Sequence, residues 1–313
     1  MPYISARLAI ALTKCPVPHP FRAGCGMGRM NNLPVPALCL FASLLAPLAL
    51  SQQPTPPPPL AGIAHAAIRV ANLNASRAFY TKLGFQEAFA FDKAGVTTQS
   101  FIKINDRQFI ELYPRTQPSD PTGFLHVCFE SADIATLNSF YLSRSLPPTP
   151  VRKAGAGNLL FTMEGPEHQN IEYTQYMPGS RHSNDFGQHL GPNRISTALV
   201  AAAVVMQDPA AAQDFYTTKL GFRGLVHPAA APNLGLDQKS VPWLQLPGSG
   251  QSIAFTPAGS AFRMIFAVDN PKQTAASLKA LNIPFVKTGA ALSIHDPDGN
   301  ILVFLVHSPD QTK

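Results

Sequence analysis

The chain repeats itself, and this repeat limits its architecture more than any other feature of the sequence. Residues 65–85 read HAAIRVANLNASRAFYTKLGF, and residues 201–222 read AAAVVMQDPAAAQDFYTTKLGF. Both stretches predict a short apolar strand, a turn and a helix that ends in Lys-Leu-Gly-Phe, where the glycine suits a helix C-cap. We therefore expect two homologous domains, at about residues 60–178 and 194–308. The polar segment 179–193 between them is predicted to be a linker.

The first domain repeats again inside itself. The stretches IAHAAIRV and FLHVCFES each predict a strand, followed by a helix and three short strands that end in FIELY and NIEYTQY. Each half has one histidine in its first strand and one glutamate in its last. His65 and Glu111 are 46 positions apart, and so are His126 and Glu172. The pattern predicts an α+β fold in which each half is a strand, a helix and three more strands.

These four residues are polar side chains in otherwise apolar strands. The alternation of faces along a strand places Glu111 on one face with Phe109 and Tyr113, and His126 on one face with Phe124 and Cys128. Burial of an isolated carboxylate costs roughly several kcal/mol unless the group is neutralised or paired. A divalent cation between two carboxylates and two imidazoles removes that cost, and these ligands suit Zn, Ni, Co, Mn or Fe. A single such residue is as often structural, but the set with its duplicated spacing favours a metal site.

The repeated motifs HAAIRVANLNASRAFYTKLGF, FIELYP, FLHVCFE and the DPDGN-like ends resemble the vicinal oxygen chelate superfamily. This superfamily includes glyoxalase I, methylmalonyl-CoA epimerase, extradiol dioxygenases and bleomycin-resistance proteins. The resemblance covers both domains and implies that each is a pair of βαβββ modules curled around a cleft. It places the metal ligands on the first and last strand of each module. When each ligand position is matched to this sequence, the implied ligands are His65, Glu111, His126 and Glu172. The order His-Glu-His-Glu is that of bacterial-type glyoxalase I.

The second domain has apolar residues where the first has ligands. We align these positions as Ala201, Ala254, Met264 and Leu302. Residues 194–308 are therefore predicted to be a degenerate domain without metal ligands, which serves as a structural partner or a ligand-binding cup. The four ligands must then close within residues 60–178, or across a homodimer of such domains, and we favour closure within one domain. His182 and His189 in the linker could cap the cleft as a lid, but we predict that they are solvated, and His295 and His307 near the end are predicted to be surface or structural residues.

The resemblance implies an enzyme that acts on a small oxygenated substrate. A bound metal polarises a carbonyl and stabilises the enediolate that forms when the adjacent C–H loses its proton. Glu172 is expected to be the general base and Glu111 to return the proton, as in a glyoxalase- or epimerase-type lyase or isomerase. One alternative is an Fe(II) extradiol-type dioxygenase with His65, His126 and Glu172 as its triad. The other is a non-enzymatic small-molecule-binding protein of the bleomycin-resistance kind.

The N-terminal region differs in composition from the rest. Residues 1–51 contain no Asp or Glu, and their apolar run LPVPALCLFASLLAPLAL follows basic residues and ends at a small-residue sequence. This layout predicts a secretory signal region, with Met27 or Met30 as its start, and a secreted or periplasmic protein. Prolines interrupt the run, so we expect no stable membrane span after cleavage. Residues 52–59, QQPTPPPP, predict a polyproline spacer.

Removal of residues 1–51 changes the charge balance. Four of the 24 Lys and Arg residues lie in this region, which leaves 20 basic residues against 18 acidic ones. A balance so close to neutral gives no electrostatic basis for binding nucleic acid, so the expected partner is a small-molecule substrate. Cys128 is then the single remaining cysteine, so the mature chain cannot form an internal disulfide.

Overall fold

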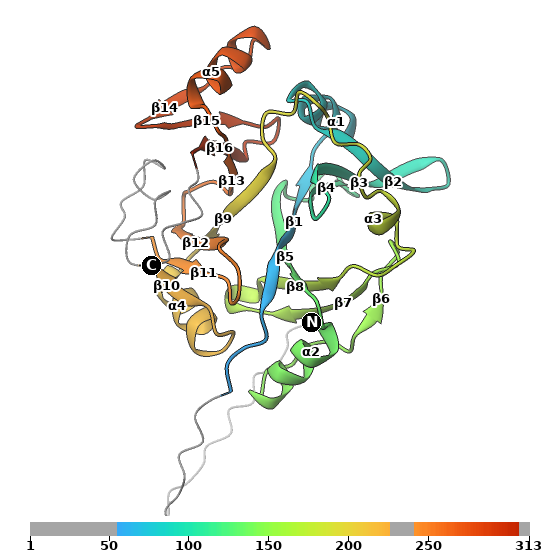
Figure 1. Cartoon of the computed structure of the whole chain (residues 1–313), viewed down its shortest axis with the longest axis vertical. Helices are drawn as coiled ribbons and strands as arrows, with labels where there is room; N and C mark the ends of the chain where they lie inside the picture. Colours follow the sequence, from blue (N-terminus) through green and yellow to red (C-terminus); the bar gives the residue numbers. More distant parts are fainter. Residues whose placement is uncertain (1–54, 226–240, 307–313) are drawn as a thin grey trace, which may run out of the picture. The chain divides into compact units, whose positions relative to one another are not determined.

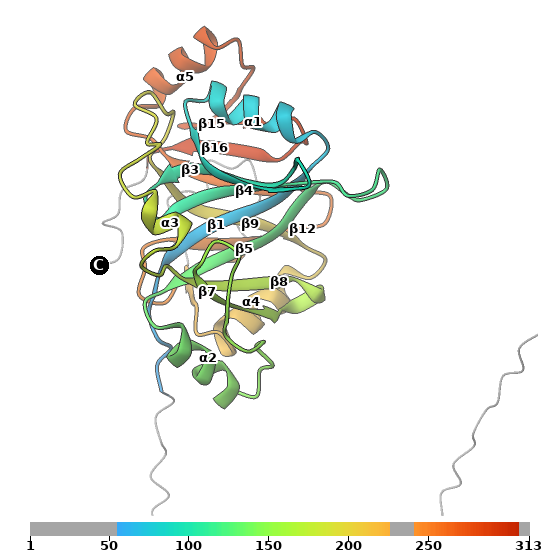
Figure 2. The same cartoon turned by 90° about the vertical axis from the view of Figure 1, so that its right-hand side faces the viewer.

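The computed structural model describes residues 55–225 and 241–306. The predicted signal region 1–51, the start of the spacer and His307 lie outside the described residues. The described part of the chain forms two eight-stranded sheets flanked by short helices (Figures 1 and 2). None of its helices combines the length and the apolar character needed to cross a membrane.

The first sheet joins two βαβββ modules. The first module consists of β1 (Leu60–Val70), α1 (Leu73–Lys82), β2 (Gln86–Lys93), β3 (Val96–Asn105) and β4 (Gln108–Pro114). The second module consists of β5 (Gly123–Ser131), α2 (Ile134–Ser143), β6 (Arg152–Lys153), β7 (Leu159–Glu164), η1 (Pro166–His168) and β8 (Asn170–Gln175). The strands follow the order β2-β3-β4-β1-β5-β8-β7-β6. The first and last strands of both modules are therefore neighbours at the centre of the sheet.

The second sheet repeats this arrangement after the short helix α3 (Arg181–Asn184). Its first module consists of β9 (Ala198–Met206), α4 (Pro209–Thr218), β10 (Arg223–Leu225), β11 (Trp243–Gln245) and β12 (Ser252–Pro257). Its second module consists of β13 (Arg263–Ala267), α5 (Pro271–Ala280), β14 (Val286–Thr288), β15 (Ala291–His295) and β16 (Ile301–Leu305). The strand order β10-β11-β12-β9-β13-β16-β15-β14 matches that of the first sheet. The predicted α+β fold of tandem paired modules is confirmed.

The helices after β1 and β9 begin and end as their sequences dictate. Asn72 caps α1 by accepting a hydrogen bond from Ala75 N, and Asp208 caps α4 in the same way. The glycine of each Lys-Leu-Gly-Phe motif has a left-handed backbone, with φ of 85° at Gly84 and 79° at Gly221. A side chain at Gly84 would also lie about 2.5 Å from a backbone oxygen of the linker. Only glycine satisfies both conditions there.

One apolar core is shared by the two sheets. The largest cluster of buried side chains contains residues from both, including Ile68 and Leu112 of the first sheet and Val204 and Phe255 of the second. Aromatic pairs join the two halves, such as Phe85 with Phe266, Phe124 with Phe262, and Phe129 with Phe222. A separate cluster that includes Ala201, Trp243, Ala254 and Val303 fills the other face of the second sheet.

The register of the second sheet corrects two positions of the predicted alignment. His65 and Ala201 are equivalent, because each pairs with the matching residues of its neighbours, and so are Glu111 and Ala254. On β13, however, Arg263 takes the place of His126, since both lie opposite the same alanine of the central strand.

The same argument moves the last position on β16. Cys128 pairs with Glu172, and its equivalent Ile265 pairs with Val303. Val303 is thus the counterpart of Glu172, and the alignment of Met264 and Leu302 with His126 and Glu172 was wrong by one residue. Met264 and Leu302 belong to the shared core on the opposite face. A shift of one residue exchanges the faces of a strand, and ILVFL is apolar on both, so the sequence carried no signal of the register.

Two acidic turns connect the domains in a reciprocal way. Asp298, in the turn before β16, accepts hydrogen bonds from Ala71 N at 2.8 Å and Ser76 Oγ at 3.4 Å, at the start of α1. Glu167, in the turn before β8, accepts from Gln207 N and Asp208 N at 2.8 Å, at the start of α4. Each domain therefore fixes the first turn of a helix in the other domain.

We expect Asp298→Ala and Glu167→Ala each to lower the free energy of unfolding by about 1 kcal/mol, because backbone donors lose charged acceptors. The two turns share no partners, so the effects should add in the double variant. Denaturant unfolding measures both. Asp214→Ala, which removes an exposed carboxylate from α4, is the control. Unchanged stability in the double variant would contradict the reciprocal connection.

Candidate metal centre

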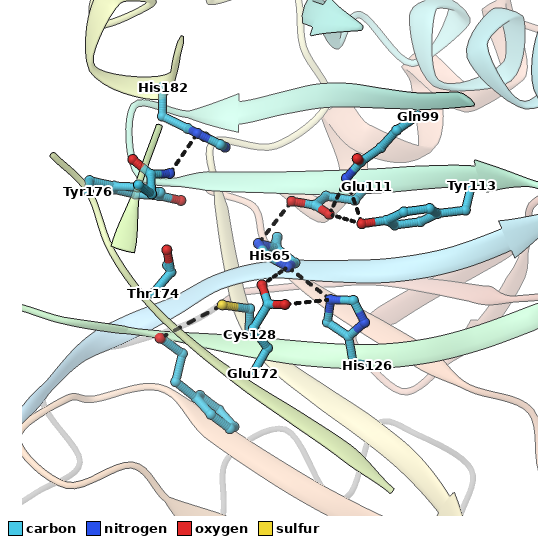
Figure 3. Close-up of polar contacts among 12 residues, drawn as sticks. His65, Gln99, Glu111, Tyr113, His126, Cys128, Glu172, Thr174, Tyr176 and His182 are labelled. Carbon is cyan, nitrogen blue, oxygen red and sulfur yellow. Dashed lines mark hydrogen bonds and ion pairs between the residues drawn. The ribbon is translucent and has the colours of Figure 1, made fainter. Parts of the chain in front are cut away.

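The four predicted ligands come from four adjacent strands and point toward one another. β1 carries His65, β4 carries Glu111, β5 carries His126 and β8 carries Glu172, and Figure 3 shows the side chains converging. His65, Glu111 and His126 are buried. The structure thus brings all four together within the first sheet, without a contribution from the second sheet.

His65 presents its two ring nitrogens to different partners. Its Nδ1 lies 3.2 Å from Oε1 of Glu111. Its Nε2 lies 3.1 Å from Nε2 of His126 and 3.4 Å from Oε1 of Glu172, and His126 Nε2 lies 4.0 Å from Oε2 of Glu172. Potential ligand atoms form two overlapping groups that share His65: one with Glu111 and His126, the other with Cys128 and Glu172. Ligand atoms around one ion lie about 3–4 Å apart, so these contacts suit a divalent cation.

Two of the four groups are in the forms that bind metals, whereas burial raises the pKa of Glu111. Burial acts to lower the pKa of His65, but the charge of Glu111 and the hydrogen bond to Glu172 outweigh it and raise that pKa. Burial lowers the pKa of His126 to about 4. Burial acts to raise the pKa of Glu172, yet the hydrogen bond and charge of His65 hold it at about 2. His126 is therefore neutral and Glu172 is ionised, which are the forms that bind metals. The raised pKa of His65 shows that the two carboxylates favour positive charge at this position, which a bound cation could supply.

Glu111 is held by two donors that the sequence analysis did not identify. Gln99 Nε2 donates to Oε2 of Glu111 at 2.8 Å, and the Tyr113 hydroxyl donates to the same oxygen at 2.9 Å (Figure 3). These bonds leave Oε1 directed at His65. Tyr113 lies two residues after Glu111, on the face where the alternation of the strand predicts it, but that pattern does not reveal its hydrogen bond to Glu111. Gln99 depends on the pairing of β3 with β4, which the sequence does not reveal.

A cavity of about 370 Å³ lies against the cluster. His65, Glu111 and Glu172 form part of its wall. Its other walls combine aromatic and polar side chains, among them Phe91, Phe101, Tyr176, Gln99, Asn158 and His182. A space of this size accommodates a small molecule. The arrangement therefore offers a substrate-sized space beside a candidate metal centre.

The prediction that His182 is solvated is wrong. Its ring is only 5% exposed and forms part of the cavity wall. Three phenylalanines, Phe89, Phe101 and Phe109, meet the ring edge-on, with centroids 4.7–5.4 Å away. Tyr176 stacks on it at 4.9 Å. Tyr176 lies only six positions before His182, but the three phenylalanines of this aromatic nest come from β2, β3 and β4, which no motif around His182 reveals.

Two contacts fix the linker helix α3 on the first sheet. Lys103 is fully buried on β3 and donates from Nζ to Oδ2 of Asp185 at 2.7 Å, and it also pairs with Asp106. Arg181 donates to Ala90 O at 2.9 Å and lies over the ring of Phe91. A buried lysine is stable only when it is paired. The start of the predicted linker is therefore part of the cavity wall.

Cys128 lies beside His126 on β5, as the alternation predicts, but it does not have the properties of a nucleophile. The side chain is fully buried, and burial raises the pKa of its thiol well above the ordinary value. A thiol that stays protonated is inert.

The buried state of His182 predicts a dependence of stability on pH. Burial lowers its pKa to about 3, whereas the unfolded chain takes up the proton near pH 6.5. Stability is then lost as pH falls from about 6.5 toward 3, and His182→Phe should remove this part of the loss, about 2 kcal/mol between pH 7 and pH 5. Chemical denaturation at the two pH values measures it. Equal losses in parent and variant would contradict the prediction.

Comparisons with known proteins bear on the fold of the chain. Residues 62–172 match the model of the Glyoxalase/Bleomycin resistance protein/Dioxygenase superfamily. No match was found among curated proteins. The 2,3-dioxygenase LapB from Pseudomonas sp. KL28 is similar in structure, with a TM-score of 0.60 and 17% identity over 80% of this chain and 93% of that chain.

Two further solved structures resemble this chain in fold to a comparable degree. One is an extradiol ring-cleaving dioxygenase from B. fuscum, with a TM-score of 0.60 and 17% identity over 82% of this chain and 75% of that one. The other is the Mn(II)-bound glyoxalase from Novosphingobium aromaticivorans, with a TM-score of 0.58 and 14% identity over 79% and 82%. Residues 62–172, which carry the whole cluster, belong to the Glyoxalase/Bleomycin resistance protein/Dioxygenase superfamily, and the chain has the fold of a tandem vicinal oxygen chelate protein.

Proposed function

We propose that the chain is a divalent-metal-dependent enzyme of the glyoxalase or epimerase type, a lyase or isomerase that acts on a small oxygenated substrate. The observation that carries the proposal is the convergence of two imidazoles and two carboxylates beside a small cavity, with His65, Glu111 and Glu172 in its wall. In this proposal His65, Glu111, His126 and Glu172 hold the ion. When bound, the ion supplies the positive charge that stabilises an enediolate.

The two glutamates differ in a way that suits different roles. The Glu172 side chain is 14% exposed, whereas that of Glu111 is 5% exposed. Hydrogen bonds from Gln99 and Tyr113 also fix one oxygen of Glu111. Glu172 can therefore meet a substrate C–H and accept its proton, as a general base must. Glu111 is the more rigid of the two, and it sets the position of the metal and can return the proton.

The second candidate is a dioxygenase of the extradiol type, and one observation favours it. The Nε2 side of His65 gathers His126 and Glu172, whereas Glu111 contacts Nδ1. An imidazole binds a metal ion through one nitrogen only. An ion at Nε2 would thus have two histidines and one carboxylate, the ligand set of non-haem Fe(II) oxygenases, with Glu111 orienting the ring of His65 from behind. Some of the similar solved structures are dioxygenases of this kind.

Elemental analysis of the chain purified without chelator tests the proposal. We expect about one transition-metal ion per chain, and little metal in the Glu111→Ala/Glu172→Ala double variant, because carboxylate ligands are lost. The Glu164→Ala/Asp214→Ala double variant removes two exposed carboxylates and should keep the metal. A folded parent that stays metal-free after reconstitution would overturn the enzyme proposal and favour a non-enzymatic binding protein.

The metal-loaded chain also separates the two reactions. An isomerase should exchange the C–H proton of an α-hydroxyketone with deuterium from solvent, which NMR detects without knowledge of the natural substrate. A dioxygenase should consume oxygen in the presence of a catechol when loaded with Fe(II). Exchange without oxygen uptake would support the first candidate, and uptake without exchange the second.

The hydrogen bonds from Gln99 and Tyr113 to Glu111 predict that loss of the Tyr113 hydroxyl weakens metal binding. Tyr113→Phe removes one of the two donors to Oε2, so we expect the affinity for the metal to fall about tenfold, the usual scale for partners of metal ligands. Competition with a chromophoric chelator measures the affinity. Tyr216→Phe is the matched control. It removes the hydroxyl of a tyrosine on α4 of the second domain, which is hydrogen-bonded to Gln169. Equal affinities in the two variants would show that the Tyr113 hydroxyl does not position Glu111.

A further inference from the structure

His182 has a defined tautomer in the wall of the cavity. Met177 N donates to Oδ1 of Asn158 at 3.2 Å, which fixes the orientation of that amide. The Nδ2 of Asn158 therefore faces Nδ1 of His182, at 2.9 Å. An amide nitrogen donates, so Nδ1 of His182 accepts, and the proton of the neutral ring lies on Nε2. Asn158 thus makes His182 a donor through Nε2.

This Nε2 has no hydrogen-bond partner among the described residues, although the ring is almost entirely buried. Buried N–H groups are nearly always paired, because an unpaired one lowers stability. The contacts that position the ring are numerous: the aromatic nest, the bond from Asn158, and the Lys103 and Arg181 contacts that fix α3. The His182 ring is held firmly while its Nε2 donor is unpaired, which indicates that its partner is a ligand in the cavity.

The metal cluster and His182 belong to the same cavity. Both His65 and His182 line it. The rings of Phe101 and Tyr176 also line the cavity. A ligand that fills the cavity therefore meets acidic and imidazole groups at one part of the wall and a neutral N–H donor at another.

We propose that His182 donates a hydrogen bond from Nε2 to an oxygen of the substrate that lies beside the metal centre. The ligand class is a small, planar, oxygen-rich molecule, such as an enediol or enediolate, whose oxygens accept from His182 and approach the His–Glu cluster. His182 stays neutral and gives up no proton, so it acts by stabilising negative charge on oxygen. The inference rests on the proposed metal-dependent function and adds a substrate-binding residue from outside the family-matched segment.

Benzohydroxamate is a suitable probe because it carries two adjacent oxygens and a planar ring. We compare its binding to the metal-loaded parent, His182→Phe and His182→Gln by calorimetry. Phenylalanine keeps the aromatic packing and removes the donor, so affinity should fall about tenfold, the scale of a hydrogen bond to a charged acceptor. Glutamine places an amide N–H near the position of Nε2 and should restore most of the affinity. His168→Phe, which changes an exposed histidine of the turn before β8, should bind like the parent.

Two readouts separate the possible failures. Metal content is measured on every variant and should be unchanged in His182→Phe, since His182 is not one of the proposed ligands. Parent-like binding in His182→Phe, with lost binding in His182→Gln, would assign His182 to packing and overturn the inference while leaving the metal centre in place. A metal-loaded parent that does not bind the probe would overturn it as well. A parent without metal would overturn the proposed function itself.

Discussion

The structure of the first domain depends on the contact of one buried imidazole with two carboxylates. His65 lies on the central strand β1, between Glu111 on one side and His126 and Glu172 on the other. Two carboxylates in an apolar sheet are tolerated only if positive charge lies between them. The parallel pairing of β1 with β4 and of β5 with β8 brings these groups together. The order of the strands therefore determines which charged groups meet at the centre of the sheet.

The fold and the cluster could be predicted from the sequence because their signals are local or repeated. Alternation of faces and the 46-residue spacing identified His65, Glu111, His126 and Glu172. The sequence could not predict the groups that support the cluster. Gln99 reaches Glu111 across a strand pair, and His182 enters from the linker between domains. Such contacts depend on register and on the path of a loop, and neither leaves a periodic pattern.

The second domain contributes through its outer face. Its side chains complete the shared core, and Asp298 fixes the first turn of α1, close to the end of β1. Its inner face, where the first domain carries its cluster, is filled by apolar side chains, among them Ala201, Ala254 and Trp243. Among the four positions that correspond to the cluster, Arg263 is the exception, a cation where the first domain has His126. The second domain thus supports the first structurally.

This division of faces has a consequence for how a duplicated chain can diverge. The outer face of the second sheet is tied to its twin by packing, so substitutions there disturb both copies. The inner face is under no such demand and can lose a catalytic centre without loss of the fold. A gene duplication of this kind therefore frees one cleft for drift or for a new ligand, while the paired backs of the sheets retain the ancestral pattern. Sequence similarity between the two domains should therefore be highest at the buried positions on the outer faces of the two sheets, where the domains pack together.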